Sequence, residues 1–529
     1  MQYIQGKNRE QSLLFPQCLE QIIDAGNDIR LIDLFVESIN MADFNFVTKQ
    51  SAEGRPAYNP KDLLKLFIYG YLNSIRSSRV LEKQCRINIE VMWLMKELCP
   101  DHNTISNFRR DNHKAIRQVF KHTLSIAKHF NLIGGKLIAG DSTKLRAQNS
   151  KKNNFNEKKI IHHTEYIEKK LDEYTALLAD ADDDNKAIIQ QQIVKKNQQK
   201  EKYNNYSKQL IDTNETQISS SDPGSRQMIT RNNITEVAYN IQTTVDAKHS
   251  LTLDYKVTNT NDTKAMGNMV RRAKTILQHN QFTALFDKGY HTGSELKYAQ
   301  QLGITTLVAV PGVAAFAPDD AYNFDKFIYN EQADTYTCPQ LQTLHTNGNW
   351  YVKSKQRYIY YVKHYKTNKC LQCPALPLCT LNKKGRLIER SEYQPCMELN
   401  KKNIEANKTI YNKRAEIIEH TYGIIKRQWG FYYITTKKGI KRASADVGLM
   451  FTAFNLRRIF NIVGQNALKK FFQQLCLLLF ERTGITKLIC FQNMPRNFSP
   501  TFCFQFTNAA STGLYALCFI LIFVTQRSF

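Results

Sequence analysis

Apolar positions in the first 130 residues recur at helical spacing. Asn59 and Pro60 supply an N-cap and a first-turn proline, and residues 63–71 then carry apolar side chains three and four positions apart. A further short helix is predicted within residues 102–110, where a capping Asn or Thr precedes two adjacent arginines. One interpretation is a helix-turn-helix in which Arg109 and Arg110 face DNA phosphates. The alternative is an ordinary helical hairpin with solvated arginines, and the pattern favours neither.

Short apolar runs replace the helical spacing after this region. Residues 136–141 and 282–287 are two such runs, and each ends in an aspartate. Residues 237–246 and 251–257 are predicted to be paired strands joined by a four-residue turn. A helix is predicted at residues 264–278. Strands that alternate with helices indicate an α/β sheet.

Residues 151–210 interrupt this alternation and are rich in Lys, Gln and Asn. Apolar residues recur every three or four positions on both sides of an Ala-Asp-Asp-Asp-Asn break at 181–185. The segment is almost neutral, with 12 Lys against 10 Asp+Glu. We predict an antiparallel two-helix arm. A solvated, partly disordered insert is the alternative.

The charge of the chain indicates a polyanionic partner. Its 529 residues include 73 Lys+Arg against 47 Asp+Glu, a formal net charge of +26. The first residues contain no apolar stretch typical of a secretory signal, so we expect a cytoplasmic, nucleoid-associated protein whose 12 cysteines are reduced or bind metal. Residues 513–524 are apolar but shorter than the ~20 residues of a membrane span, so no membrane association is expected.

Three carboxylates are candidates for catalysis because of where they lie. Asp141 and Asp287 each follow an apolar strand, the position at which α/β sheets present their chemistry. Glu419 lies in a predicted helix within residues 401–442, which hold 11 Lys+Arg against three Glu. Carboxylate oxygens in such a setting suit Mg²⁺, and two ions about 4 Å apart support in-line phosphoryl transfer. The alternatives are helix caps for the aspartates and a structural ion pair for the glutamate.

Three sequence blocks resemble the catalytic blocks of DDE transposases of bacterial insertion sequences. They are Ile-Ala-Gly-Asp-Ser-Thr at 138–143, Phe-Asp-Lys-Gly-Tyr at 286–290 and Glu-His-Thr-Tyr-Gly-Ile-Ile-Lys at 419–426. The last block is similar to the Tyr-Arg-Glu-Lys signature of that family. Arg414 precedes Glu419 by one residue more than the commonest spacing, which leaves Glu416 as a rival acid. Further similar blocks stand at 221–226, 239–242 and 258–262, and the resemblance runs from about residue 58 to residue 458.

This resemblance implies a ribonuclease-H-like core in which Asp141, Asp287 and Glu419 are the catalytic acids and bind Mg²⁺ or Mn²⁺. It also implies cleavage and strand transfer on double-stranded DNA, at terminal inverted repeats and a target, by a homodimer assembled on that DNA. Lys288, Arg414 and Lys426 are then expected to hold phosphates, and Tyr290 and Tyr411 to contact the transferred end. With Arg109 and Arg110, these five residues complete the expected DNA contacts.

Four cysteines precede Glu419: Cys338, Cys370, Cys373 and Cys379. The Cys-x₂-Cys step suits a tetrahedral metal, and four thiolates would complete a Cys₄ zinc site. A Cys-rich insertion at this place also resembles one branch of the transposase family, the branch with an N-terminal helical domain. A structural Zn²⁺ is the prediction, and four reduced, partly buried thiols are the alternative.

The predicted organisation is α/β with two insertions. It comprises an N-terminal helical DNA-binding domain (1–130), the first part of the core (131–310) with a helical arm inserted at 151–215, a Cys-rich insertion (311–400), the second part of the core with Glu419 (401–465), and a tail of unclear status (466–529). The expected function is that of a transposase. The alternatives are a DNA-binding regulator or domesticated transposase without strand transfer, and a metal-dependent nuclease that cuts without joining.

Overall fold

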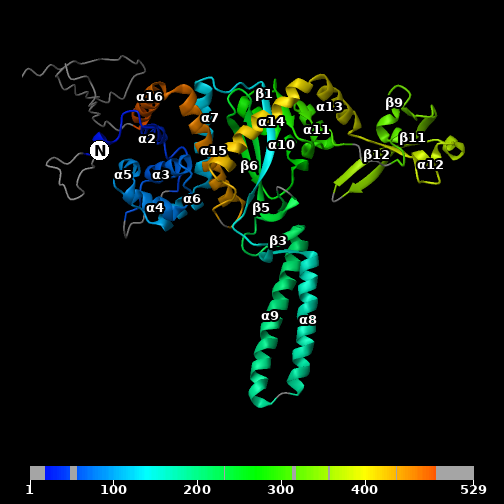
Figure 1. Cartoon of the computed structure of the whole chain (residues 1–529), viewed down its shortest axis with the longest axis horizontal. Helices are drawn as coiled ribbons and strands as arrows, with labels where there is room; N and C mark the ends of the chain where they lie inside the picture. The colour runs from blue at the N-terminus through cyan, green and yellow to red at the C-terminus, as the bar shows by residue number, and fades with distance from the viewer. Residues whose placement is uncertain are drawn as a thin grey trace, which may run out of the picture.

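The structure, a computed structural model, describes residues 18–47, 56–180, 182–230, 233–312, 317–355, 358–436 and 438–483. The apolar run at 513–524 therefore lies outside the described residues. No helix within the described ranges is long and apolar enough to cross a membrane. Figure 1 shows a central sheet flanked by helices and two insertions that project from it.

A mixed six-stranded sheet forms the centre of the molecule. Its strands are β1 (Leu137–Arg146), β4 (Arg226–Ile229), β5 (Thr235–Asp246), β6 (Thr252–Thr258), β7 (Thr283–Phe286) and β8 (Thr305–Val308). β5 is antiparallel to β1, β4 and β6, whereas β7 is parallel to both β1 and β8. The helices α10 (Met266–Leu277) and α11 (Gly293–Gln301) precede β7 and β8, as crossover connections between parallel strands require.

The register of β1 and β7 sets the two aspartates opposite each other. Ala139 pairs with Leu285 in this parallel pair. Asp141 and Asp287 each follow two residues later, Asp287 directly after the end of β7 and Asp141 within β1, which continues to Arg146. The pairing thus makes the two acids neighbours, although the expectation that a strand ends at Asp141 is wrong, because β1 continues beside β5 for five more residues.

Seven helices form the N-terminal part of the described chain. They are α1 (Leu19–Ile22), α2 (Ile29–Glu37), α3 (Pro60–Leu72), α4 (Ser78–Ile87), α5 (Ile89–Met95), α6 (His102–Asp111) and α7 (His113–His129). Asn59 caps α3 as the sequence indicates, its side chain accepting from the Lys61 N–H. The cap of α6 is Asp101 rather than an Asn or Thr, because its carboxylate accepts from the two following N–H groups of the first turn.

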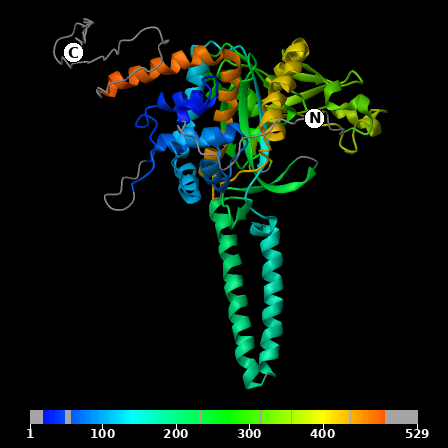
Figure 2. The ribbon, with the colours of Figure 1, turned by 60° about the vertical axis from the view of Figure 1, so that its left-hand side comes forward.

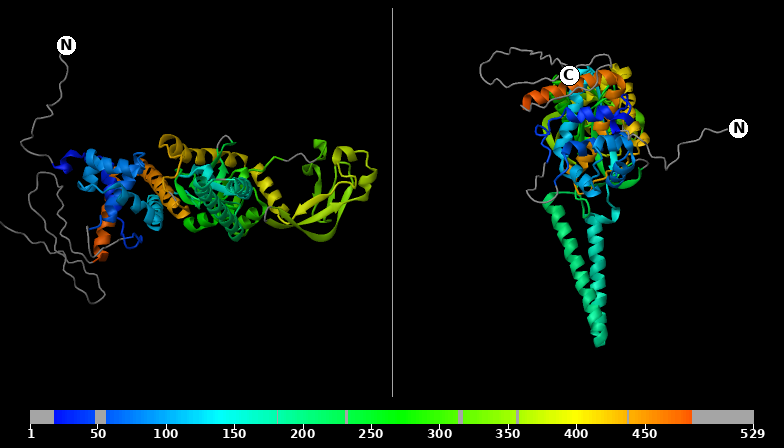
Figure 3. Two further views of the ribbon diagram at one scale, coloured as in Figure 1. Left: turned by 90° about the horizontal axis from the view of Figure 1, so that it is seen from below. Right: turned by 90° about the vertical axis from the view of Figure 1, so that its left-hand side faces the viewer.

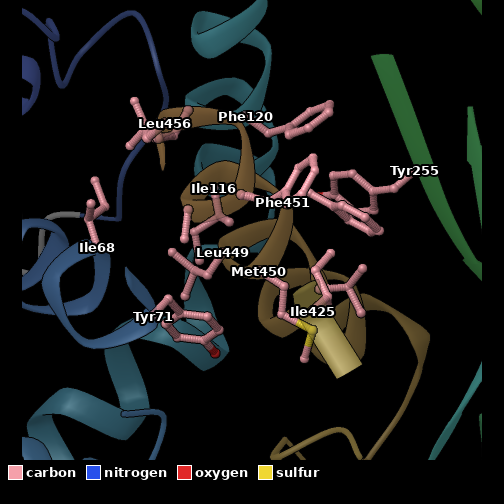
Figure 4. Close-up of a cluster of buried hydrophobic side chains, with 14 of the residues drawn as sticks. Ile68, Tyr71, Ile116, Phe120, Tyr255, Ile425, Leu449, Met450, Phe451 and Leu456 are labelled. Carbon is pink, nitrogen blue, oxygen red and sulfur yellow. The ribbon is translucent and has the colours of Figure 1, made fainter. Parts of the chain in front are cut away.

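One hydrophobic core joins these helices to the sheet. The long helix α15 (Ile440–Val463) lies between them and is buried along most of its length. Figure 4 shows its Leu449, Met450 and Phe451 among side chains of α3, α7 and β6, including Tyr71 and Tyr255. The N-terminal helices are therefore packed onto the core and do not form an independent module. The helix α16 (Gln465–Thr483) adds Leu468 and Phe472 to the same core, so the start of the predicted tail is folded.

A helical hairpin projects from the sheet. Its helices are α8 (Glu157–Ala179) and α9 (Asp183–Thr213), and at its base β2 (Asn154–Asn156) pairs with β3 (Gln217–Ser219). A small apolar cluster of Phe155, Ile160, Leu210 and Ile218 holds the base together. Figures 2 and 3 show the two helices running side by side away from the rest of the molecule.

The second insertion is a five-stranded antiparallel sheet. Its strands are β9 (Ile328–Asn330), β10 (Thr335–Thr337), β11 (Thr343–Lys355), β12 (Tyr358–Lys366) and β13 (Ile388–Ser391), in the order β13-β12-β11-β10-β9. The short helices η7 (Asn368–Gln372) and α12 (Leu376–Cys379) lie between β12 and β13. The chain then returns through α13 (Gln394–Ala406), α14 (Lys408–Tyr422) and a π-helical turn at Gly423–Gln428. Ile417 and Ile418 of α14 pack on Ala139, Val245 and Leu285 of the central sheet.

Candidate active site

Two carboxylates lie near each other where β7 ends beside β1. Burial raises the pKa of Asp141 to about 6, and the nearby carboxylates of Asp287 and Asp262 push it in the same direction. The Ser142 N–H and the Arg414 guanidinium oppose this rise. The side chain of Asp141 nevertheless remains 26% exposed. These features describe a partly desolvated acid pair that is open to a ligand.

A glycine precedes Asp141 because a ring occupies the space beside it. A Cβ atom on Gly140 would lie 2.6 Å from Cζ of Phe286 and closer still to Cε1 of the same ring. Phe286 is fully buried and precedes Asp287 directly. The close approach of β1 and β7 at the two acids therefore depends on the missing side chain at position 140.

Helix α14 is attached to the acid pair by three polar contacts. Nη1 of Arg414 lies 3.3 Å from Oδ2 of Asp141. The hydroxyl of Tyr411 donates to the carbonyl of Phe286 over 3.2 Å, and that of Tyr422 to the carbonyl of Asp141 over 3.3 Å. Partial burial lowers the pKa of Arg414, but Asp141, Tyr411 and Asp287 together raise it by more. Arg414 thus neutralises part of the negative charge of Asp141 and Asp287.

Glu419 lies on this helix, next to the face that packs on the central sheet. It follows the buried Ile418 and is exposed, as is Glu416 one turn earlier. Within the described ranges, no group of three His, Cys, Asp or Glu side chains has the arrangement of a metal site. The structure thus brings Asp141 and Asp287 together, and Glu419 lies on the helix whose Arg414 contacts Asp141. Lys288, next to Asp287, is exposed, and Lys426 in the π-helical turn is half-buried.

The structure contradicts the expected DNA contact of Arg109. This side chain is 4% exposed and donates to the Tyr71 hydroxyl and the Arg76 carbonyl, each over 3.0 Å. It also lies 3.9 Å from the buried carboxylate of Asp446 in α15. Because α6 turns this face toward α3 and α15, neither a phosphate contact nor a solvated arginine describes it. Its neighbour Arg110 is partly exposed and pairs with the adjacent aspartate, Nε to Oδ1 over 2.7 Å.

Tyr290 is also wrongly predicted as a DNA contact. It is 1% exposed, and its hydroxyl donates to Oε1 of Gln242 over 2.6 Å. Its ring packs 5.1 Å from that of Phe286, centroid to centroid. A ring so enclosed cannot stack on a DNA end, so Tyr290 supports the site from inside the protein.

A polar network beside Asp141 was not predicted from the sequence. Its centre is Asp262 in the 3₁₀ turn η3 (Asp262–Lys264), which accepts from Asn240 over 2.8 Å and Gln242 over 2.7 Å. The ammonium of Lys144 completes it at 3.2 Å. Burial alone would raise the pKa of Asp262, but these donors lower it below its ordinary value. Asn240, Gln242 and Asp262 lie in the blocks at 239–242 and 258–262 that resemble blocks of the transposase family, and this resemblance could have identified them.

The four cysteines also come together, in the second insertion. Cys338, Cys370, Cys373 and Cys379 all line one small cavity between the β10–β11 turn, η7 and α12. None of these thiols forms a disulfide. Figure 1 shows this region to one side of the central sheet, so the cysteines and the acids are separate candidate sites.

Two protein-family models match the chain. A family described as "Transposase domain (DUF772)" matches residues 17–111, and a "Transposase DDE domain" matches residues 337–460. The solved structure of a piggyBac transposase synaptic complex with hairpin DNA is similar with a TM-score of 0.30 and 9% sequence identity, covering 88% of this chain and 83% of that chain. The comparison with curated proteins gave no match. The second family match includes the cysteines, Arg414 and Glu419.

Proposed function

Because the chain is a transposase of the DDE type, we propose that it cleaves DNA at the ends of its own insertion sequence and transfers the cut strands to a target. The observation that carries this proposal is the acid pair Asp141 and Asp287 on adjacent parallel strands, paired with Arg414 from the matched DDE domain. Acids in this position are where α/β sheets present chemistry.

We further propose that the core is ribonuclease-H-like. The strand order β6-β5-β1-β7-β8 supports this, with the first three strands antiparallel and the last two parallel to β1. The hairpin of α8 and α9 and the second sheet are then insertions into that core. The core would present its acids from the two central parallel strands, as the register of Asp141 and Asp287 allows.

Asp141, Asp287 and Glu419 are the proposed ligands of a pair of Mg²⁺ or Mn²⁺ ions. The donor set fits, because hard carboxylate oxygens on a partly exposed edge are what these ions prefer. Such ions polarise the phosphodiester and activate the attacking water or DNA 3′-hydroxyl. Glu419 is included because it begins the 419–426 block and lies on the helix that already contacts Asp141 through Arg414.

The protein's own residues would then hold the DNA in place. Lys288 and Lys426 are proposed to bind phosphates. Arg414 is proposed to leave its ion pair with Asp141 and to bind a phosphate when DNA enters. Tyr411, which is half-buried beside Asp287, would contact the transferred end. The net charge of +26 supports a double-stranded DNA partner. A homodimer on DNA and a cytoplasmic, nucleoid-associated location complete the proposal.

A cleavage and strand-transfer experiment tests this assignment. Labelled duplexes carrying the inverted repeats that flank the gene are incubated with the full chain, Mg²⁺ and a target plasmid. Asp141→Asn, Asp287→Asn and Glu419→Gln should each abolish cleavage while DNA binding persists. Glu416→Gln is the matched control, because it removes an equally exposed acid from the same helix. It should cut like the wild type.

The outcomes separate the rival functions. Cleavage without joined products would indicate a nuclease, and binding without cleavage would indicate a regulator. Wild-type cleavage by Asp141→Asn would refute the proposed mechanism, and loss of cleavage in Glu416→Gln but not in Glu419→Gln would reassign the third acid. The four-cysteine cavity takes no part in these steps, and a structural Zn²⁺ there is a separate proposal.

A further inference from the structure

We propose that Cys338, Cys370, Cys373 and Cys379 bind one structural Zn²⁺ that holds the second insertion together. These cysteines come from three chain segments: the turn after β10, the η7 turn after β12, and the end of α12. All four line a single cavity of about 30 Å³. Thiols separated by up to 41 positions in the sequence therefore converge on one point. This inference is independent of the proposed chemistry at the central sheet.

The composition of the cavity wall selects the ligand. The remaining lining side chains are apolar, amide or basic, and no carboxylate or imidazole is among them. An all-thiolate donor set is unsuited to Mg²⁺ or Ca²⁺ and typical of tetrahedral Zn²⁺. A cavity of about 30 Å³ admits a single ion, whereas small-molecule sites occupy roughly 300 Å³ or more.

A backbone donor and two basic side chains lie beside the thiols. The backbone N–H of Gln342 donates to Sγ of Cys338 over 3.3 Å. Arg386 and Lys369 line the same cavity, and Nη1 of Arg386 also donates to the carbonyl of Cys379 over 3.3 Å. Four thiolates around Zn²⁺ carry two net negative charges, which these two cations would balance.

The loop that closes the cavity is fitted to one cysteine. Gly385 has a φ of +90°, and a Cβ atom there would lie 2.6 Å from Cβ of Cys370. Only a glycine therefore allows residues 380–387 to cross directly over this thiol. The wall is thus built by chain segments that pass close to the sulfur atoms and not by loosely placed side chains.

The small core of the insertion gives the metal a role. Its buried cluster consists of Phe327, Tyr336, Leu344, Tyr365, Cys379 and Ile388, with Cys338 packed against it. Small folded units with so little core are commonly stapled by disulfides or metals. The thiols surround the cavity without yet having the arrangement of a metal site. Cysteine has a single side-chain torsion, so rotation about it can bring each sulfur toward the Zn–S distance of about 2.3 Å.

Metal analysis of the full chain tests the proposal. Protein purified under reducing conditions should contain one zinc per chain by inductively coupled plasma mass spectrometry. Replacing it with Co²⁺ should give the visible absorption of a tetrahedral thiolate complex. Cys370→Ser and Cys373→Ser should lose the metal. Cys396→Ser is the matched control, because Cys396 is another partly exposed thiol. It contacts Gln300 and does not line the cavity. It should keep one zinc.

The Co²⁺ spectrum keeps the proposal falsifiable if the serine variants fail to fold, because it is recorded on the wild-type chain. Wild-type protein that binds neither Zn²⁺ nor Co²⁺, with all its thiols open to a thiol reagent under native conditions, would overturn the inference. Equal zinc content in Cys373→Ser and the wild type would also overturn it. Iron in place of zinc would refute the choice of metal.

Discussion

Replacing Gly140 by alanine should damage the active site through packing alone. The new methyl carbon would lie 2.6 Å from Cζ of Phe286, about 1 Å inside the ordinary contact of ~3.5–4.0 Å between carbon atoms. The ring cannot simply turn away, because it is fully buried and packs on Tyr290, itself held by a hydrogen bond to Gln242. The strain must be relieved by moving β1 away from β7. Overpacking of this kind costs about 1–3 kcal/mol.

The activity should suffer more than the stability. Separation of β1 from β7 moves Asp141 away from Asp287, and misplacement of catalytic groups by about 1 Å can cost on the order of 10²-fold in rate. Urea unfolding followed by circular dichroism measures the first effect, and cleavage of labelled element ends measures the second. Gly423→Ala is the stability control, because a Cβ atom at that helical glycine would meet nothing within 4 Å.

A second-site change identifies the cause. Phe286→Leu removes the ring atoms that the alanine methyl would strike, so the double variant Gly140→Ala/Phe286→Leu should cleave faster than Gly140→Ala alone. Wild-type stability and cleavage in Gly140→Ala would refute the packing argument. A double variant that is no better than the single one would show that Phe286 is not the obstacle.

Three further predictions concern other charges of the structure. Arg414→Gln removes a cation that lowers the pKa of Asp141, so the pH-rate profile of cleavage should move to higher pH, and an unmoved profile would contradict the pairing. Asp446→Asn leaves the buried Arg109 without its carboxylate partner and should lower the free energy of unfolding in urea by about 3–5 kcal/mol, whereas a loss below ~1 kcal/mol would refute this role. Burial lowers the pKa of His122 to about 4, so the unfolded chain binds more protons than the folded one between that value and ~6.5. Stability should fall by up to ~3 kcal/mol as the pH drops through this window, and His122→Leu should flatten that dependence in urea titrations.

The sequence alone was sufficient wherever the deciding pattern is local. The paired strands at 237–246 and 251–257 are confirmed as β5 and β6, and the helix at 264–278 as α10. The strands that carry Asp141 and Asp287 are confirmed as well. Alternation, apolar runs and caps report the conformation of a few neighbouring residues. The acid at 287 marks the end of β7, whereas β1 continues past Asp141 to Arg146. That the two strands pair was implied only by the family resemblance, and the structure shows it.

The sequence could not determine which face of an element is covered. Arg109 and Tyr290 carry the chemistry of DNA contacts, yet α3, α15 and the central sheet enclose them. Asp262 lies 121 positions from Asp141 and joins the site only because β5 and β6 bring it there. Such contacts depend on how distant segments pack, and packing selects one partner among many of similar chemistry.

The two candidate sites show the same division. The residue types at Asp141, Asp287 and the four cysteines could be recognised from spacing, but their convergence required the folded sheets. For Glu419 the sequence supplies a helix and a block of the right kind, whereas its direction depends on how α14 sits on the central sheet. Local sequence therefore determined which groups were available, and tertiary packing decided which of them meet, because burial and proximity arise from contacts between segments far apart in the chain.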